Sequence, residues 1–209
     1  MMTSEEWLSV LTACGVRRKT AERWAPFFAA EIQSHTFSAG WSEVDDFLSN
    51  VLHESQMLER LEENLNYTTA ARICEIWPSR FRTVDDAKMF VRNPEALANK
   101  VYAGRLGNSS IGDGWRYRGS GPIQVTGKAN FAELERITGF PLVAAPFLLR
   151  RVGREALRVC VAWWEGHIPD SIMGDVKKVR RAVNGGEIGL SEVAAIQKRA
   201  SAALSAFSG

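Results

Sequence analysis

The chain has 209 residues, of which 45% are hydrophobic and 24% charged, and its formal net charge is only +2. A chain of this length buries a substantial core, and its balanced composition excludes a disordered chain or an acidic tail. The small net charge also argues against a dedicated nucleic-acid binder, which normally carries a strong basic excess. Because no repeat or low-complexity linker divides the sequence, we expect a single, monomeric domain over residues 1–209.

The first half of the sequence predicts a succession of helices. Apolar residues recur at helical spacing over residues 20–33, where Pro26 must lie in the first turns or break the helix. Ser42 followed by Asp45 has the form of a capping box, which predicts a helix running through residues 44–52. Further helix starts are predicted at Thr83 and at Asn93–Pro94.

The sequence changes character between Gly104 and Gly127, where seven glycines interleave with aromatic and basic residues. Such a long irregular stretch inside a domain is usually functional. After it, helices are predicted near residues 130–138, 153–166, 172–183 and 190–207. The expected fold is therefore mainly α, with a small glycine-rich loop or β insert.

The cysteines and histidines lie in no metal-binding or redox spacing. We expect Cys14, Cys74 and Cys160 to be small buried apolar residues, and we expect neither a metal nor a cofactor. The N-terminus carries acids where a signal peptide needs cations, and no run approaches the ~18 apolar residues of a membrane span. These features predict a soluble chain that is made in the cytoplasm, without stable membrane insertion.

Glu54 is the first candidate for chemistry. It follows Phe47 and Val51 by seven and three positions, so it shares their apolar helix face. Desolvation on that face would raise the pKa of the carboxyl, as a general acid near neutrality requires. A glutamate that turns to solvent at the helix end is an equally good interpretation.

Glu63 is the second candidate, nine positions later. On one continuous helix the two carboxyls would be ~13.5 Å apart along the axis and on opposite faces. They can cooperate only if the helix stops near residues 57–60 and the chain returns through the Asn-rich segment 62–67. Two carboxyls, one neutral and one ionised, are the usual equipment of glycosidases.

Four ordered blocks resemble glycoside hydrolase family 19, which contains chitinases and phage endolysins with a lysozyme-like, mostly helical fold. They are His53-Glu54-Ser55, Glu63-Asn64-Leu65-Asn66-Tyr67, the segment from Tyr117 to Thr126, and Val183-Asn184-Gly185-Gly186. The similarity spans roughly residues 45–190 and is greatest to single-domain endolysins of phages and prophages, which have no separate wall-binding domain. The departures at Ser55-Gln56-Met57 and at Ala129 put chitin in doubt as the main substrate.

The resemblance implies a role for each matched residue. Glu54 corresponds to the general acid, Glu63 to the general base, and Thr126 to a hydroxyl that helps to hold the attacking water. Glu62 remains a rival for the base, since adjacent side chains on a loop can exchange roles. Contacts to the sugar chain are implied or expected at Gln124, Asn130 and Asn184, and as ring-stacking platforms at Trp115 and Tyr117, which could equally be core residues.

The resemblance implies an endolysin that hydrolyses the β-1,4 bonds of peptidoglycan with inversion and lyses the host cell. The two carboxyls would then lie ~6.5–9.5 Å apart. A family 19 chitinase and a non-catalytic wall-binding module are the alternatives. The enzyme would be made in the host bacterial cytoplasm and act on periplasmic peptidoglycan, released by a holin-type partner. Residues 150–199 carry ten Lys and Arg against six Asp and Glu, an excess that would favour anionic envelope polymers.

Overall fold

The computed structural model describes residues 1–33 and 35–207 and is mainly helical, which confirms the expected fold class. The chain forms two compact units. The first unit comprises Met1–Leu61, Gly121–Ile123 and Leu148–Gly209, and the second unit comprises Glu62–Ser120 and Gln124–Phe147. Ser34, Ser208 and Gly209 lie outside the described residues, and the single domain expected over residues 1–209 stays a prediction.

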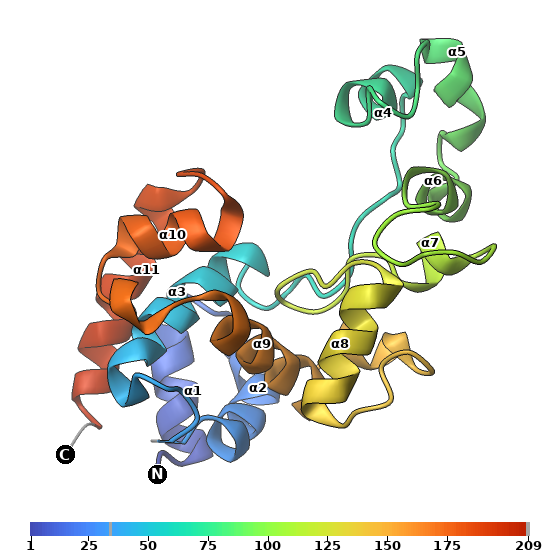
Figure 1. The fold of residues 1–209 in the computed structure, drawn as a ribbon. Helices are drawn as coiled ribbons and strands as arrows, with labels where there is room; N and C mark the ends of the chain where they lie inside the picture. The colour runs from blue at the N-terminus through green and yellow to red at the C-terminus, as the bar shows by residue number, and fades with distance from the viewer. Residues whose placement is uncertain (34, 208–209) are drawn as a thin grey trace. The chain divides into compact units, whose positions relative to one another are not determined.

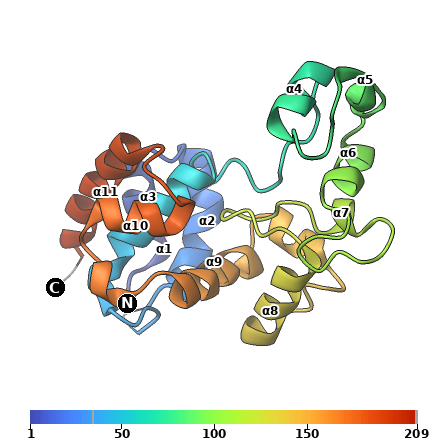
Figure 2. The same cartoon turned by 45° about the horizontal axis from the view of Figure 1, so that its top comes forward.

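The first unit is a helical assembly in which α3 packs against α10 and α11, and α1 packs against both α2 and α11 (Figures 1 and 2). Its apolar core contains three fully buried tryptophans, Trp7, Trp24 and Trp164. Its helices are α1 (Ser4–Ala13), α2 (Arg18–Glu31), η1 (Gly40–Glu43), α3 (Val44–Glu54), α9 (Arg154–His167), η4 (Asp170–Ile172), α10 (Val176–Asn184) and α11 (Leu190–Ser205). The short helix η3 (Pro146–Arg150) begins in the second unit and ends in the first.

Two expectations about helix starts are wrong. Helix α2 begins at Arg18 and continues through Pro26, because burial of Trp24 and Phe28 on the same helix offsets the missing hydrogen bond. The capping box expected at Ser42 is absent, because η1 runs directly into α3 and Ser42 Oγ donates instead to Ala39 O at 2.9 Å.

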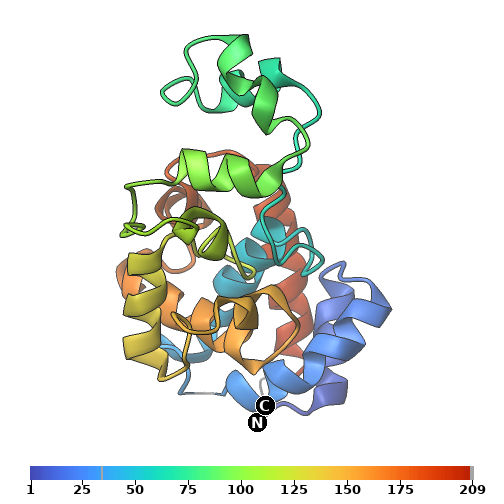
Figure 3. The same ribbon diagram turned by 90° about the vertical axis from the view of Figure 1, so that its right-hand side faces the viewer.

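The second unit has its own apolar core, and its helices are shorter. Within it α4 packs on α5 and α6 packs on α7, as the teal and green segments of Figure 3 show. The predicted caps at Thr83 and Asn93 are confirmed, since each side chain accepts a hydrogen bond from the first turn of its helix. The helices are α4 (Ala70–Ile76), α5 (Val84–Ala87), η2 (Lys88–Phe90), α6 (Pro94–Val101), α7 (Asp113–Arg116) and α8 (Lys128–Thr138).

The glycine-rich stretch contains helix α7 and two isolated bridges, Glu62–Ser120 and Ser120–Val125, so the β part of the expected insert is limited to these bridges in the described chain. Its glycines permit close backbone approach. A Cβ atom on Gly127 would lie 2.2 Å from Leu106 Cβ, and its φ of +88° is itself unfavourable for other residues. The local fold of this stretch therefore requires glycine where the chain segments meet.

The cysteine expectation is confirmed at two of three positions. Cys14 and Cys160 are fully buried, and burial raises the pKa of the Cys14 thiol to about 11 and also raises that of Cys160. Cys74 is partly exposed, and its thiol donates to Thr83 O at 3.1 Å. Among the residues described, no helix combines the length and the apolar character needed to cross a membrane.

Asp46 joins three segments of the first unit. Its side chain is fully buried, one oxygen accepts from Gly174 N at 2.7 Å, and the other accepts from the Gln197 amide on α11. Burial outweighs these hydrogen bonds and raises the pKa of Asp46 to about 6, from an ordinary value of 3.8. The anchor of α3 to α11 is therefore sensitive to pH.

This raised pKa predicts a stability change with a definite sign. The folded state holds the Asp46 proton to higher pH than the unfolded state, so the contribution of Asp46 to stability is full at low pH and is lost as pH rises through about 6. Urea unfolding of the native protein and of Asp46→Asn at about pH 4.5 and pH 7.5 measures this contribution, since asparagine does not titrate. We expect the native protein to lose stability relative to the variant at the higher pH; a pH-independent difference would contradict the assignment.

Candidate active site

Glu54 is the last residue of α3 and is paired with a buried cation. Its Oε1 lies 2.6 Å from Nη1 of Arg180, a residue of α10. The Arg180 side chain is only 2% exposed, whereas that of Glu54 is 33% exposed. The structure places this carboxyl between the two interpretations left open by the sequence, at the surface end of an ion pair with a buried guanidinium.

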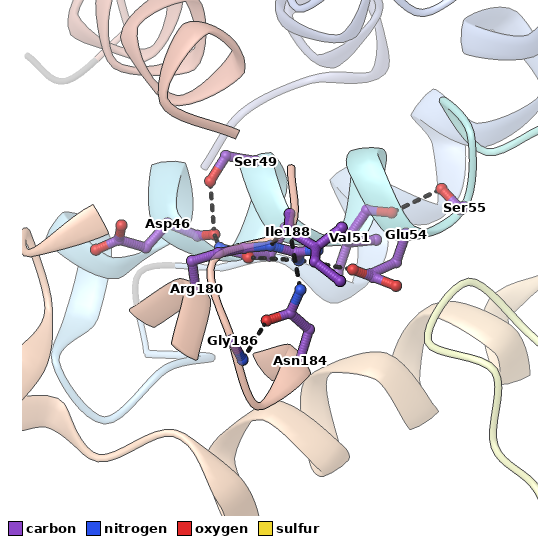
Figure 4. A network of polar contacts seen from close by, with 10 residues as sticks. Asp46, Ser49, Val51, Glu54, Ser55, Arg180, Asn184, Gly186 and Ile188 are labelled. Carbon is purple, nitrogen blue, oxygen red and sulfur yellow. Dashed lines mark hydrogen bonds and ion pairs between the residues drawn. The ribbon is translucent and has the colours of Figure 1, made fainter. Parts of the chain in front are cut away.

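Arg180 has two further partners, both in the first unit (Figure 4). Its Nε donates to Ile188 O at 2.8 Å, and its Nη1 also donates to Asn50 Oδ1 at 3.3 Å. Arg180 was not predicted as a site residue, because it is one of four basic residues of α10, a pattern typical of a solvated face. Its spacing from Val176 and Val183 places it on their apolar helix face, and this is the signal that could have indicated its burial.

The chain leaves α3 through a strained turn. Gln56, Met57 and Leu58 all have left-handed φ angles, of 50°, 61° and 64°. Each such residue costs on the order of 1 kcal/mol, and Ser55 stabilises the turn because its hydroxyl donates to Val51 O and accepts from Leu58 N. The chain does break between Glu54 and Glu63, but the helix ends at Glu54, before the expected residues 57–60.

Glu63 lies in the second unit and is held by uncharged donors. The Tyr102 hydroxyl donates to Oε1 at 2.7 Å, and Gly119 N donates to Oε2 at 3.2 Å. Burial, followed by the charge of Glu63, raises the pKa of Tyr102, so the phenol stays protonated and remains a donor. Tyr102 was missed because it lies 39 residues from Glu63 and shares no motif with it.

Glu62 has a different environment. Its carboxylate forms an ion pair with Arg118, whose guanidinium also lies 3.6 Å from the centre of the Trp115 ring. Nε and Nη2 of Arg118 both donate to Oε1 of Glu62, so this carboxylate is committed to a structural ion pair. The contacts therefore favour Glu63 over Glu62 as a base.

Gln124 lies beside Glu63, and Thr126 and Asn130 continue from it along the chain. A Cβ atom on Gly119 would lie 2.8 Å from Gln124 Oε1 and 2.9 Å from Glu63 Cβ, so both side chains pack on this glycine. Thr126 Oγ1 donates to Gln124 O at 3.0 Å, and Asn130 Nδ2 donates to Thr126 O at 2.8 Å. The three predicted residues are thus linked within their own segment, and Gln124 packs with Glu63 on Gly119.

The structure distinguishes the two aromatic candidates, which the sequence left open between cleft and core. Tyr117 is only 2% exposed, packs against Phe131 and donates its hydroxyl to Val143 O at 3.0 Å. Its ring therefore has no free face for stacking on a sugar, and it is a core residue. Trp115 is partly buried against the second core, and one face of its ring is covered by Arg118.

The polar atoms of Asn184 bond within its own loop, and its expected contact to the sugar chain stays a prediction. Its Nδ2 donates to Ile188 O at 3.1 Å, and its Oδ1 accepts from Gly186 N at 2.9 Å. The loop packs closely on His53, since a Cβ atom on Gly189 would lie 2.3 Å from His53 Nε2. His53 is therefore a packing neighbour beside Glu54, as the sequence indicated.

The candidate residues are divided between the two units. Glu54, with Arg180 and Asn184, belongs to the first unit, and Glu63, with its hydrogen-bonding partners, belongs to the second. The separation of the two carboxylates stays a prediction. Within residues 1–33 and 35–207, no cluster of three or more His, Cys, Asp or Glu side chains is arranged to hold a metal ion.

Comparison with known proteins gives relatives in bacteria and plants. A glycosyl hydrolase family 19 domain-containing protein of Haemophilus influenzae is 37% identical over 149 residues, which cover 70% of this chain and 72% of the relative. An endochitinase of Arabidopsis thaliana is 29% identical over 86 residues, covering 41% of this chain and 31% of that protein. No family model matches the sequence.

Solved structures share the fold at low sequence identity. Chitinase C from Streptomyces griseus HUT6037 matches with a TM-score of 0.55 and 14% identity, covering 97% of this chain and 92% of that one. A family GH19, class IV chitinase from Zea mays matches with a TM-score of 0.51 and 17% identity, covering 98% and 82%. This likeness shows the fold, and the identity and coverage of the bacterial relative show that the chain belongs to glycosyl hydrolase family 19.

Proposed function

We propose that the protein hydrolyses β-1,4 glycosidic bonds of bacterial peptidoglycan and acts as an endolysin. The observation that carries the chemistry is the contrast between two glutamates. Glu63 is held by a phenol and a backbone amide, and Glu54 is oriented by a buried guanidinium. Each carboxyl is thereby fixed in position by specific partners, as an acid and a base that act on one bond require.

The proposed reaction is a single displacement with inversion. Glu54 donates its proton to the leaving glycosidic oxygen as the bond from that oxygen to C1 breaks. Glu63 accepts a proton from a water whose oxygen bonds to C1 on the opposite face, and Thr126 helps to hold that water. Exchange with solvent then restores both carboxyls. Arg180 engages Oε1 of Glu54, so the proton that is donated is assigned to Oε2.

Peptidoglycan is proposed as the polymer on the likeness to single-domain endolysins and on the departures from the chitinase pattern. Ala129, which stands where the chitinases have a nearby aromatic residue, is exposed. Chitin is the second candidate, favoured by the plant endochitinase relative and by the fold shared with two solved chitinases. Both polymers consist of β-1,4-linked N-acetylated amino sugars, so the chemistry is common to the two.

The cellular route is also a proposal. The enzyme would be made in the host cytoplasm and would reach the periplasmic wall through a lesion formed by a holin-type partner. The basic residues of the segment 150–199 would favour contact with anionic envelope polymers.

The products of digestion test the polymer and the bond. We expect purified murein to yield fragments with N-acetylmuramic acid at the reducing end, identified by mass spectrometry after borohydride reduction. Chitin oligomers at the same concentration serve as the comparison. Turnover of chitin oligomers alone would assign the protein to the chitinases instead, and cleavage of neither polymer would support a wall-binding module.

Substitution of the glutamates tests their roles. We expect Glu54→Gln and Glu63→Gln each to lower kcat for murein by about 10²- to 10⁴-fold, because each removes one proton-transfer group. Glu62→Gln is the matched control and should retain activity within about tenfold, since it removes only a charge paired with Arg118. Full activity of Glu54→Gln, or loss of activity only in Glu62→Gln, would overturn the assignment.

Tyr102→Phe tests the support of the proposed base. The change removes the hydroxyl that donates to Glu63 and keeps the ring in its apolar surroundings. We expect kcat to fall about tenfold with little change in KM, because a hydrogen bond to a charged group contributes about 1.5–3 kcal/mol. An unchanged kcat in this variant, with normal folding by circular dichroism, would show that the tyrosine does not orient the base.

A further inference from the structure

The carbonyl of Ile188 is a shared acceptor between Asn184 and Arg180. Asn184 Nδ2 donates to it at 3.1 Å and Arg180 Nε donates to it at 2.8 Å, as Figure 4 shows. The same guanidinium donates through Nη1 to Glu54 Oε1 at 2.6 Å. A continuous chain of hydrogen bonds therefore runs from the amide of Asn184 to the carboxylate of Glu54.

We infer that Asn184 is a positioning residue for Glu54, acting through the Ile188 carbonyl and Arg180. This inference rests on the proposed function, in which Glu54 is the general acid. Asn184 fixes the carbonyl, the carbonyl sets the rotation of the guanidinium, and the guanidinium sets the place of Oε1. Its own two polar groups are engaged in the loop, since Oδ1 also accepts from Gly186 N.

The surroundings make this chain of contacts stiff. The Arg180 side chain is 2% exposed and is held at a further point by Asn50, so it has little freedom to swing without losing partners. The loop that carries Ile188 is braced where Gly189 meets the ring of His53, the residue before Glu54. A displacement of the carbonyl is therefore expected to reach Glu54 rather than to be absorbed by the loop.

A direct sugar contact is the competing role for Asn184, and the two roles differ in kinetics. A contact that binds substrate equally before and during reaction affects KM when it is lost. A group that only orients the acid affects kcat, because misplacement of a catalytic group by about 1 Å can cost about 10²-fold. The KM-against-kcat split therefore separates the two.

The substitution Asn184→Asp removes one of the two hydrogen bonds of the side chain and keeps the other. Aspartate keeps an acceptor for Gly186 N but cannot donate to Ile188 O, whereas Asn184→Ala removes both bonds. Glu187→Gln is the matched control in the same loop, because Glu187 is exposed and pairs with Lys177 and Arg181, which lie outside the chain of contacts to Glu54.

The experiment measures kcat and KM on solubilised murein glycan or, if only chitin is cleaved, on chitin oligomers. We expect Asn184→Asp and Asn184→Ala to lower kcat by about ten- to a hundredfold with KM within about twofold, and Glu187→Gln to change neither. A rise in KM at unchanged kcat, or full activity of Asn184→Asp, would overturn the inference.

A second readout needs no activity. The Nε–H resonance of Arg180 in 15N-labelled protein, assigned by its loss in Arg180→Lys, should shift in Asn184→Asp and stay in place in Glu187→Gln. An unmoved resonance in Asn184→Asp would contradict the positioning role. If Glu54→Gln retains lytic activity, the proposed function fails, while this resonance still decides whether Asn184 orients Arg180.

Discussion

The burial of the Arg180 guanidinium is the constraint on which the position of Glu54 depends. A cation removed from water requires hydrogen-bond partners, and α3 together with the loop after α10 supplies them as Asn50, Glu54 and Ile188 O. Asp46 secures the other end of α3 through Gly174 and α11. Packing of α3 and the position of its last carboxyl are therefore set together.

The candidate residues around Glu63, in the second unit, are held by a different kind of contact. Glu63 is bound by a neutral phenol and a backbone N–H, and a glycine at position 119 allows the approach of both Glu63 and Gln124. Tyr102 and Gly119 N each donate to a different oxygen of Glu63, so the carboxylate is held at both of its atoms. The preceding residue, Glu62, is instead held by an ion pair with Arg118.

Periodicity, caps and ordered motifs are local signals, so the sequence predicted many of the helices and singled out the two glutamates, whose catalytic roles stay predictions. It did not predict Arg180 or Tyr102, whose partners lie 126 and 39 residues away. It also left Tyr117 undecided between cleft and core, and burial against Phe131 settles it as core. The hydrogen bonds of Asn184 within its loop were not predicted either, because they depend on backbone geometry and not on residue type.

The anomeric configuration of the first product tests the proposed pairing of Glu54 and Glu63 most directly. Proton NMR during the first minutes of cleavage, before mutarotation, distinguishes the two outcomes on soluble murein glycan or chitin oligomers. An acid and a base acting on opposite faces of the sugar through one water predict the α-anomer. Initial release of the β-anomer would mean a retaining reaction, and would contradict the roles assigned to the two glutamates.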